Sequence, residues 1–310
     1  MPPSTDRPVS RRQRGAGRRF LVVGDVLDAV IVQTRAPSIG DDDDAAVIRN
    51  RPAGAGGDTA AWLGWLGAEV DLVARVGVED AYRHERALED AGVRPHLLQE
   101  ACAVTGTVVS VRNDTGRSSL TEPGASAAVD ALDVPSDLVA QAHLVHLTGA
   151  GMLGGGGASR IADLVARART GSARVSVDPS AVSVVDTIGA GSFLDAVAGV
   201  DLLLPSAAEA LALTGADDVE AAAALLTEHV PLVVVTLGPQ GALLARRGRA
   251  PETVQPTPAT VTDTVGAGNA FAAGFLRAWA TDPVRVGVAA REGTRVAARA
   301  LGFVGGRPPV

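Results

Sequence analysis

The stretch 261–275 carries the residues best suited to chemistry in this 310-residue chain. A glycine turn there precedes an apolar run with helical spacing, and the residues that matter are, in chain order, Asp263, Thr264, Gly266, Ala267, Gly268 and Asn269. Glycines let the backbone turn tightly, while the first N–H groups of a helix lack intrahelical partners and carry a partial positive charge. The stretch therefore predicts an anion site whose donors are the backbone N–H groups of residues 266–268.

This stretch resembles the second signature of the PfkB/ribokinase-like sugar kinases, Asp-Thr-x-Gly-Ala-Gly-Asp-x-Phe. In that family the turn holds the phosphoryl group in transit, and the last Asp takes the proton from the substrate hydroxyl. Here Asn269 occupies that position. An amide oxygen is not a useful base at neutral pH, and general-base assistance contributes roughly 10²–10⁴ in rate. The hypothesis is a protein that binds nucleotide and a polyol but turns over slowly, either as a degenerate relative or as an Asp→Asn variant.

A second region, 53–67, passes from a glycine loop into a helix of small residues and resembles the family's first signature. The resemblance places the sugar near Asp28, Gly56, Gly57 and Asp58, with Asp58 at a position where the family has Asn. The family's sugar-binding aspartate position holds Ala29, one residue after Asp28. Since one step along a strand reverses the side-chain direction, Asp28 can bind sugar only if its strand ends early or bulges.

The nucleotide side is also predicted from resemblance. In relatives the turn matching Thr236, Gly238 and Gly241 borders the nucleotide, and Asp263 and Thr264 lie on the magnesium side. Glu209 matches the Glu of the family's Asn-x-x-Glu, which organises magnesium and phosphate contacts, while Ser206 replaces the Asn. Ser206 and Glu209 also fit a capping box, which needs no ligand. ATP and Mg²⁺ are the implied cofactors, and a monovalent cation is a third candidate.

Two other glycine motifs compete with this interpretation. Residues 186–192 nearly repeat the anion turn, but only the later copy continues as the family signature does. Separately, Gly149-x-Gly151-x-x-Gly154, with Asp178 beyond it, matches the dinucleotide fingerprint and gives the alternative of an NAD-dependent oxidoreductase. That fingerprint normally opens its domain, whereas this copy lies in mid-chain.

The elements around these motifs alternate between short apolar strands and helices, beginning with a buried strand near residues 20–26. The resemblance implies a three-layer α/β/α Rossmann-like, ribokinase-like core over residues 20–310, with a mostly parallel sheet. Strands near 28–52 and 103–122 would form a small β-sheet lid that excludes water from the transfer.

Composition narrows the remaining choices. The net charge of -7 argues against a nucleic-acid partner, and no apolar run reaches membrane-spanning length. One cysteine, Cys102, fits a reducing, cytoplasmic setting. The arginine-rich residues 1–19 are predicted to form a disordered basic tail, and the acidic run 40–44 a solvated loop. The five histidines show no metal-ligand spacing.

The sequence thus favours an ATP-dependent kinase acting on a hydroxyl of a sugar or nucleoside. A sugar- and nucleotide-binding relative with little or no activity is the second hypothesis, and the oxidoreductase is the third. By analogy with family members that pair through their lids, a homodimer is expected.

Overall fold

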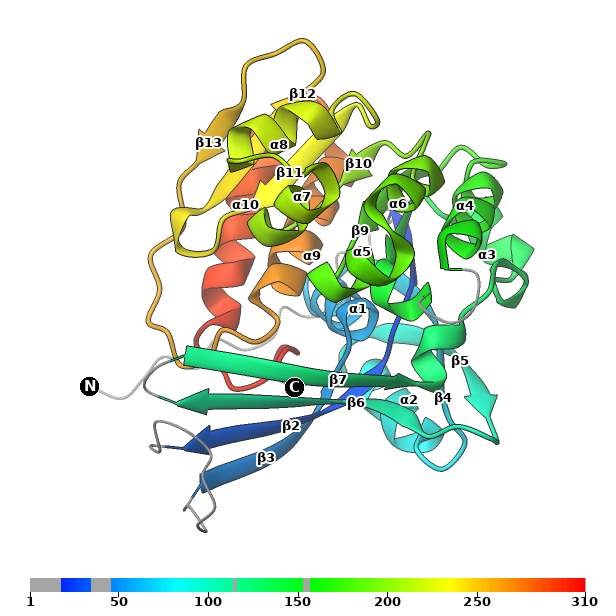
Figure 1. Ribbon diagram of the computed structural model, residues 1–310. Helices are drawn as coiled ribbons and strands as arrows, with labels where there is room; N and C mark the ends of the chain where they lie inside the picture. Colours follow the sequence, from blue (N-terminus) through cyan, green and yellow to red (C-terminus); the bar gives the residue numbers. More distant parts are fainter. Residues whose placement is uncertain (1–17, 35–45, 114–115, 153–156, 310) are drawn as a thin grey trace.

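The computed structural model describes residues 18–34, 46–113, 116–152 and 157–309. Most of the predicted basic tail, the acidic run 40–44 and Gly154 of the dinucleotide fingerprint lie outside these residues. Within them, a nine-stranded sheet runs through the molecule and a separate four-stranded sheet lies beside its helices (Figure 1).

The large sheet is mostly parallel. In spatial order its strands are β13 (Glu252–Val254), β12 (Ala242–Arg246), β11 (Leu232–Thr236), β10 (Leu202–Leu203), β9 (Arg174–Asp178), β8 (Leu144–Thr148), β1 (Arg19–Val23), β4 (Glu69–Gly77) and β5 (Val93–Glu100). Only β12 runs against its neighbours β11 and β13. The central strands are mostly apolar and buried along almost their whole length, because helices cover both faces of a parallel sheet.

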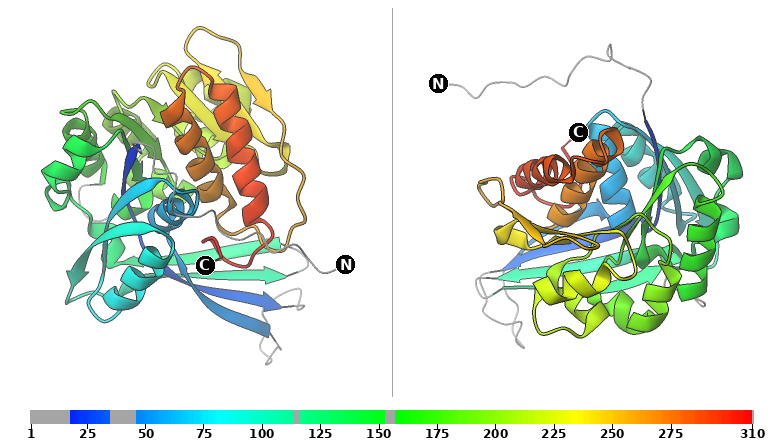
Figure 2. Two further views of the ribbon diagram at one scale, coloured as in Figure 1. Left: turned by 180° about the vertical axis from the view of Figure 1, so that it is seen from behind. Right: turned by 90° about the horizontal axis from the view of Figure 1, so that it is seen from above.

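Alternate residues of β1 show how the two layers are built. Leu21 and Val23 pack on one face, in a core shared with helices α3 to α8, whereas Phe20 and Val22 pack on the other with α1, α2, α9 and α10 (Figure 2). The helices are α1 (Ala55–Trp65), α2 (Ala81–Asp90), α3 (Ser136–Gln141), α4 (Gly157–Ala168), α5 (Val182–Ile188), α6 (Ala190–Ala196), α7 (Ala207–Thr214), α8 (Val219–Leu226), α9 (Ala267–Thr281) and α10 (Val286–Ala300). Short 3₁₀ turns are η1 (Ala125–Ala128), η2 (Ala131–Asp133), η3 (Gly149–Met152) and η4 (Gly238–Gln240).

The small sheet has the order β3 (Ala46–Ala53), β2 (Leu27–Thr34), β6 (Thr105–Asn113) and β7 (Gly116–Gly124). Strand β2 pairs antiparallel with β3 and parallel with β6, and β6 and β7 form the expected hairpin. The segments predicted for the lid form this sheet, so the predicted three-layer core with a mostly parallel sheet and a small second sheet is confirmed.

Polar residues stand at the carboxyl ends of three of the parallel strands, β8, β9 and β11. Thr148 and Asp178 end neighbouring strands in register, and Thr236 ends β11. In open α/β sheets, ligands bind in the crevice outside these strand ends. Helix α9 begins near the same edge, since Gly268 in its first turn lines one pocket together with Asp178 and Thr236. None of the described helices is long and apolar enough to cross a membrane.

Candidate active site

The predicted anion turn is formed at the start of α9. Gly266 is the N-cap residue, with φ of 74° in the left-handed region that favours glycine. A Cβ on Gly268 would meet no atom within 4 Å, so open space lies in front of the first helical turn. The helix N-terminus therefore has the geometry and the partial positive charge of an anion site.

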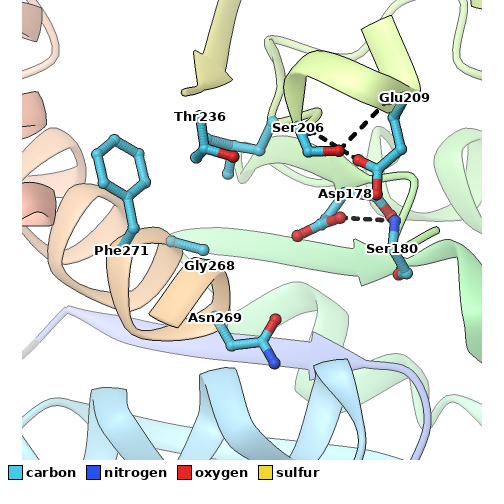
Figure 3. A pocket seen from close by; sticks show the side chains of 10 residues that line it. Asp178, Ser180, Ser206, Glu209, Thr236, Gly268, Asn269 and Phe271 are labelled. Carbon is cyan, nitrogen blue, oxygen red and sulfur yellow. Dashed lines mark hydrogen bonds between the residues drawn. The ribbon is translucent and has the colours of Figure 1, made fainter. Parts of the chain in front are cut away.

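A pocket of about 100 Å³ adjoins this turn. Its lining comes from four stretches of the chain and consists of Asp178, Ser180, Leu204, Ser206, Glu209, Thr236, Gly268, Asn269, Phe271 and Ala272 (Figure 3). The structure thus brings together four predicted residues, Thr236, Glu209, Gly268 and Asn269. The earlier glycine copy at 186–192 instead joins α5 to α6 in the outer helical layer, away from the pocket lining.

Two carboxylates face the turn across the pocket. Asp178 accepts a 2.7 Å hydrogen bond from the Ser180 backbone N–H, and burial raises its pKa well above the ordinary value, with a further rise from Glu209. Burial also raises the pKa of Glu209. The predicted capping box is present, since the Ser206 N–H donates to Glu209 Oε2 at 2.8 Å and the Ser206 hydroxyl accepts from the Glu209 N–H.

These oxygens fit Mg²⁺ in the form that accompanies a nucleotide. Among the described residues, no group of three or more His, Cys, Asp or Glu side chains could hold a metal ion by itself. Mg²⁺, however, usually keeps several waters and is held by one or two carboxylates together with substrate phosphates. Asp178 and Glu209 would supply those carboxylates, and a bound cation would lower the cost of ionising both.

Other residues predicted for the nucleotide side lie outside the pocket lining. Gly238 and Gly241 form the turn after β11, where a Cβ on Gly241 would stand 2.1 Å from the Val254 carbonyl oxygen, which gives that glycine a packing reason. Asp263 is buried and accepts from the Val265 and Gly305 N–H groups at 3.2 and 3.0 Å. It therefore ties the anion turn to the C-terminal segment. Thr264 is exposed.

On the other side of α9, Asp58 lies in the first turn of α1 with 2% of its surface exposed. Asn269 donates from Nδ2 to Asp58 Oδ2 at 3.4 Å, and Arg307 donates from Nε to Oδ1 at 3.3 Å. Burial raises the pKa of Asp58 to about 7 although the Arg307 charge lowers it, and the charge of Asp25 adds to the rise.

Gly56 and Gly57 permit this close approach. A Cβ on Gly56 would lie 2.9 Å from the carbonyl carbon of Gly24, and one on Gly57 would lie 2.6 Å from Nη2 of Arg307. Helix α1 thus starts directly against the turn after β1, with Asp58 held toward α9.

Asp28 occupies a regular strand position and is held by another partner. Strand β2 pairs continuously with β3 and β6 at this residue, so it neither ends early nor bulges. Both Asp28 oxygens accept from Arg83, at 2.6 and 2.7 Å, and this ion pair lowers the pKa of Asp28 although burial opposes it. Ala29 is packed in a small apolar cluster with Leu27 and Ile31. The Asp28 carboxylate lies close enough to Arg307, the partner of Asp58, for its charge to favour the protonated guanidinium, and its place beside the acceptor stays a prediction.

Sequence reasoning missed the residues that hold the site together. Asp25 accepts from the Ala55 and Gly56 N–H groups at 2.9 and 3.1 Å and from Thr148 Oγ1 at 3.0 Å, which anchors the start of α1 to two strand ends. A carboxylate directly after a buried strand was a usable signal for Asp25. No signal in the sequence marked Arg307, because its partner Asp58 is 249 residues away.

The first two glycines of the dinucleotide fingerprint have packing reasons as well. A Cβ on Gly149 would lie 2.7 Å from the Pro179 carbonyl oxygen, and one on Gly151 would lie 2.8 Å from the Gly24 backbone. These contacts explain both glycines without a dinucleotide.

Known proteins of similar sequence identify the family of this chain. The profile of the pfkB family carbohydrate kinase matches residues 18–309. A 1-phosphofructokinase of Rhodobacter capsulatus is 33% identical over 283 residues, which cover 85% of this chain and 84% of that protein.

Solved structures agree on the fold. A probable sugar kinase from Rhizobium etli CFN 42 superposes with a TM-score of 0.83 at 23% identity, covering 94% of this chain and 96% of its own. An adenosine kinase from Sinorhizobium meliloti gives 0.82 at 22% identity, with coverage of 95% and 97%. The expectation of a carbohydrate kinase from the two glycine signatures is confirmed by the family match and the relative. The chain belongs to the pfkB family of carbohydrate kinases.

Proposed function

We propose that this protein transfers the γ-phosphoryl group of ATP to a hydroxyl group of a sugar or a sugar-like acceptor. The observation that carries the proposal is the placement of the α9 N-terminus between two sets of polar groups. Asp178 and Glu209 line the pocket on one side of it, and Asp58 contacts Asn269 on the other. A phosphoryl group at the turn would lie between a nucleotide and an acceptor.

The roles of the chain's residues follow from the chemistry of the step. The N–H groups of the Gly266–Gly268 turn, with Ala267 between the glycines, would stabilise the charge that spreads over the phosphoryl oxygens. Thr236, which lines the pocket, would lie beside the nucleotide. Mg²⁺, when bound near Glu209 and Asp178, would neutralise phosphate charge; the remaining work of positioning belongs to the protein.

The acceptor is proposed as a sugar or a related polyol, placed beside Asp58, Gly56 and Gly57. The Rhodobacter capsulatus relative is a 1-phosphofructokinase, which adds phosphorylated fructose to the candidates. Asp28, engaged by Arg83, would join the acceptor site only if that ion pair opened.

A ligand-binding relative with little activity is the second candidate, and Asn269 is the observation that favours it. No carboxylate stands at residue 269, so direct proton removal by that side chain is absent. Positioning by the anion turn does not require that carboxylate, and nucleotide binding would therefore persist in either case.

Titration calorimetry with ATP and with NAD, each with and without Mg²⁺, separates these proposals from the oxidoreductase alternative. The kinase proposal requires magnesium-dependent ATP binding. ADP release would then be measured with fructose, fructose 1-phosphate, ribose, adenosine and ketogluconate, in the presence and absence of K⁺. Acceptor-dependent ADP release supports a kinase. Binding of ATP without release on any acceptor supports the binding relative, and tight NAD binding without ATP binding would overturn both.

The proposal also covers the cellular location and the oligomeric state of the protein. We propose a cytoplasmic protein, consistent with the single free cysteine, Cys102. A homodimer through the small sheet is proposed as well, supported by Val47, Ile48 and Leu120, which leave 50%, 62% and 73% of their surfaces exposed on it. Sedimentation at micromolar concentration tests the dimer.

A further inference from the structure

The first turns of α1 and α9 meet through one pair of side chains. Asp58, from α1, accepts the 3.4 Å hydrogen bond from the Asn269 amide of α9. In Figure 3 the amide nitrogen of Asn269 points away from Asp178 and Glu209, while its amide oxygen lies on their side. The carboxylate that contacts residue 269 therefore comes from the acceptor side of the site.

The two oxygens of Asp58 are held differently. Oδ1 accepts from Arg307 Nε at 3.3 Å, and Arg307 is itself fixed by a 3.2 Å hydrogen bond from Nη2 to the Ala53 carbonyl oxygen. Oδ2 has the long contact with Asn269. A Cβ on Gly306 would stand 1.9 Å from Oδ2, so the C-terminal segment leaves room for this oxygen only because it has glycine there. Gly306 therefore packs against Oδ2, and the hydrogen bond from Asn269 is the contact that an acceptor hydroxyl would have to replace.

We propose that Asp58 is the general base of this site and that Asn269 orients the acceptor hydroxyl toward it. The inference rests on the proposed phosphoryl transfer. The hydroxyl inserts at the Asn269–Asp58 contact, accepts from Asn269 Nδ2 and donates to Asp58 Oδ2. As the acceptor oxygen forms its bond to the γ-phosphorus, its proton passes to Oδ2. The bond between that phosphorus and the bridging oxygen breaks, ADP leaves with the electron pair, and Asp58 later returns the proton to water.

The charges around Asp58 suit this role. Arg307 of the C-terminal segment favours the ionised form, whereas burial and Asp25, in the turn after β1, favour the protonated form. Asn269 of α9 is neutral. The resulting pKa of about 7 is close to the working pH, which is where a general base is most effective. Asp178 and Glu209 are less suited, because the first accepts from Ser180 and the second from the Ser206 backbone on the far side of the pocket.

Exchanging the two side chains tests the proposal. The variants are Asp58→Asn, Asn269→Asp and the double variant D58N/N269D, assayed with ATP, excess Mg²⁺ and the uncharged acceptors fructose, ribose and adenosine. Asp71→Asn is the matched control, because Asp71 is also buried and paired with an arginine, Arg94, at 2.8 Å on β4 and β5. Asp58→Asn should lower kcat by roughly 10²–10⁴, and D58N/N269D should recover at least tenfold over D58N. Asp71→Asn should leave kcat within about twofold of the parent while lowering the melting temperature.

The outcomes separate this inference from the function on which it rests. An active parent with an equally active, folded Asp58→Asn would overturn the base assignment and leave the kinase standing. The base assignment would also be overturned, and the kinase would stand, if the parent were inactive and either N269D or D58N/N269D were active. No activity from any variant on any acceptor would overturn the kinase itself.

The pH dependence of kcat/KM in the parent protein is a second test, and it needs no variant. A purely structural role of Asp58 would not produce the pH dependence that a general base produces. With an uncharged acceptor, kcat/KM should rise with pH through an apparent pKa near 7, because only the ionised carboxylate accepts the proton. A profile that is flat between pH 5.5 and 8.5 would overturn the assignment even if Asp58→Asn fails to fold.

Discussion

A Cβ on Gly266 would stand 2.3 Å from the Cα of Gly306, so the anion turn of α9 and the C-terminal segment approach as closely as two glycines allow. Gly266 also has φ of 74°. Gly266→Ala should therefore suffer both backbone strain and a clash, together about 2–6 kcal/mol of unfolding free energy. Urea unfolding measures this.

Gly215→Ala is the matched control for that prediction. Gly215 has φ of 68° at the end of α7, but a Cβ there would meet nothing within 4 Å. Gly215→Ala should lower the unfolding free energy only by the backbone strain, about 1–2 kcal/mol. Equal losses for the two variants would show that the contact with Gly306 contributes nothing to stability.

Gly268→Ala should separate binding from folding. A methyl group there enters open space beside the pocket, and alanine favours the helix by up to about 1 kcal/mol over glycine. The unfolding free energy should stay equal or rise, while the affinity for MgATP falls at least tenfold because the methyl group obstructs approach to the N–H groups. Calorimetry on the folded variant decides the point, and an unchanged Kd would place the phosphate elsewhere.

Arg307→Met should raise the pKa of Asp58, since Arg307 supplies both a charge and a hydrogen bond that favour the carboxylate. The titration of Asp58 can be followed by carbon NMR of labelled aspartate, with Asp58→Asn identifying the signal. The midpoint should move above the value of about 7 expected for the parent. Arg295→Met removes an arginine paired with Glu292 on α10 and serves as the control; a shift of similar size in this variant would refute the assignment to Arg307.

Asp178→Asn should stabilise the fold at high pH. Burial raises the pKa of Asp178, so the folded state holds this proton more tightly than the unfolded chain does. The stability that the carboxyl contributes is complete below its ordinary value of 3.8 and is lost as the pH rises through the raised folded value. The amide that replaces the carboxyl does not titrate. In the presence of EDTA, the melting temperature of the variant should therefore be higher than that of the parent at pH 8 and equal to it near pH 4. A lower melting temperature at pH 8 would contradict the assigned cause.

Local patterns in the sequence were enough to predict the strands and helices of the core and part of the candidate site. The apolar run of β1 and the glycine turn before α9 each carry their own signal within a few residues, and the structure has both. Asp28 shows the limit of such signals. Its place near the sugar depended on an interrupted strand, whereas β2 continues through it, and Arg83 of α2 takes its carboxylate.

Contacts between distant parts of the chain could not be predicted from one sequence. The resemblance marked Asp58 and Asn269 as separate departures from the family pattern, but only the fold brings them into contact, 211 residues apart. The motif at Gly241 predicted a place beside the nucleotide, but its close packing against the Val254 carbonyl oxygen became apparent only in the fold. Arg307 and Gly306 gained a role only when the C-terminal segment was seen beside α1.

The most direct test of the proposed phosphoryl transfer follows labelled phosphate from ATP to the acceptor. The parent protein is incubated with γ-labelled ATP, Mg²⁺ and each acceptor, and the products are separated and identified by mass. Label should appear in a phosphorylated sugar, formed only with Mg²⁺ and reduced in Gly268→Ala. Label that appears in no acceptor, or solely in free phosphate at the same rate without a sugar, would contradict the transfer.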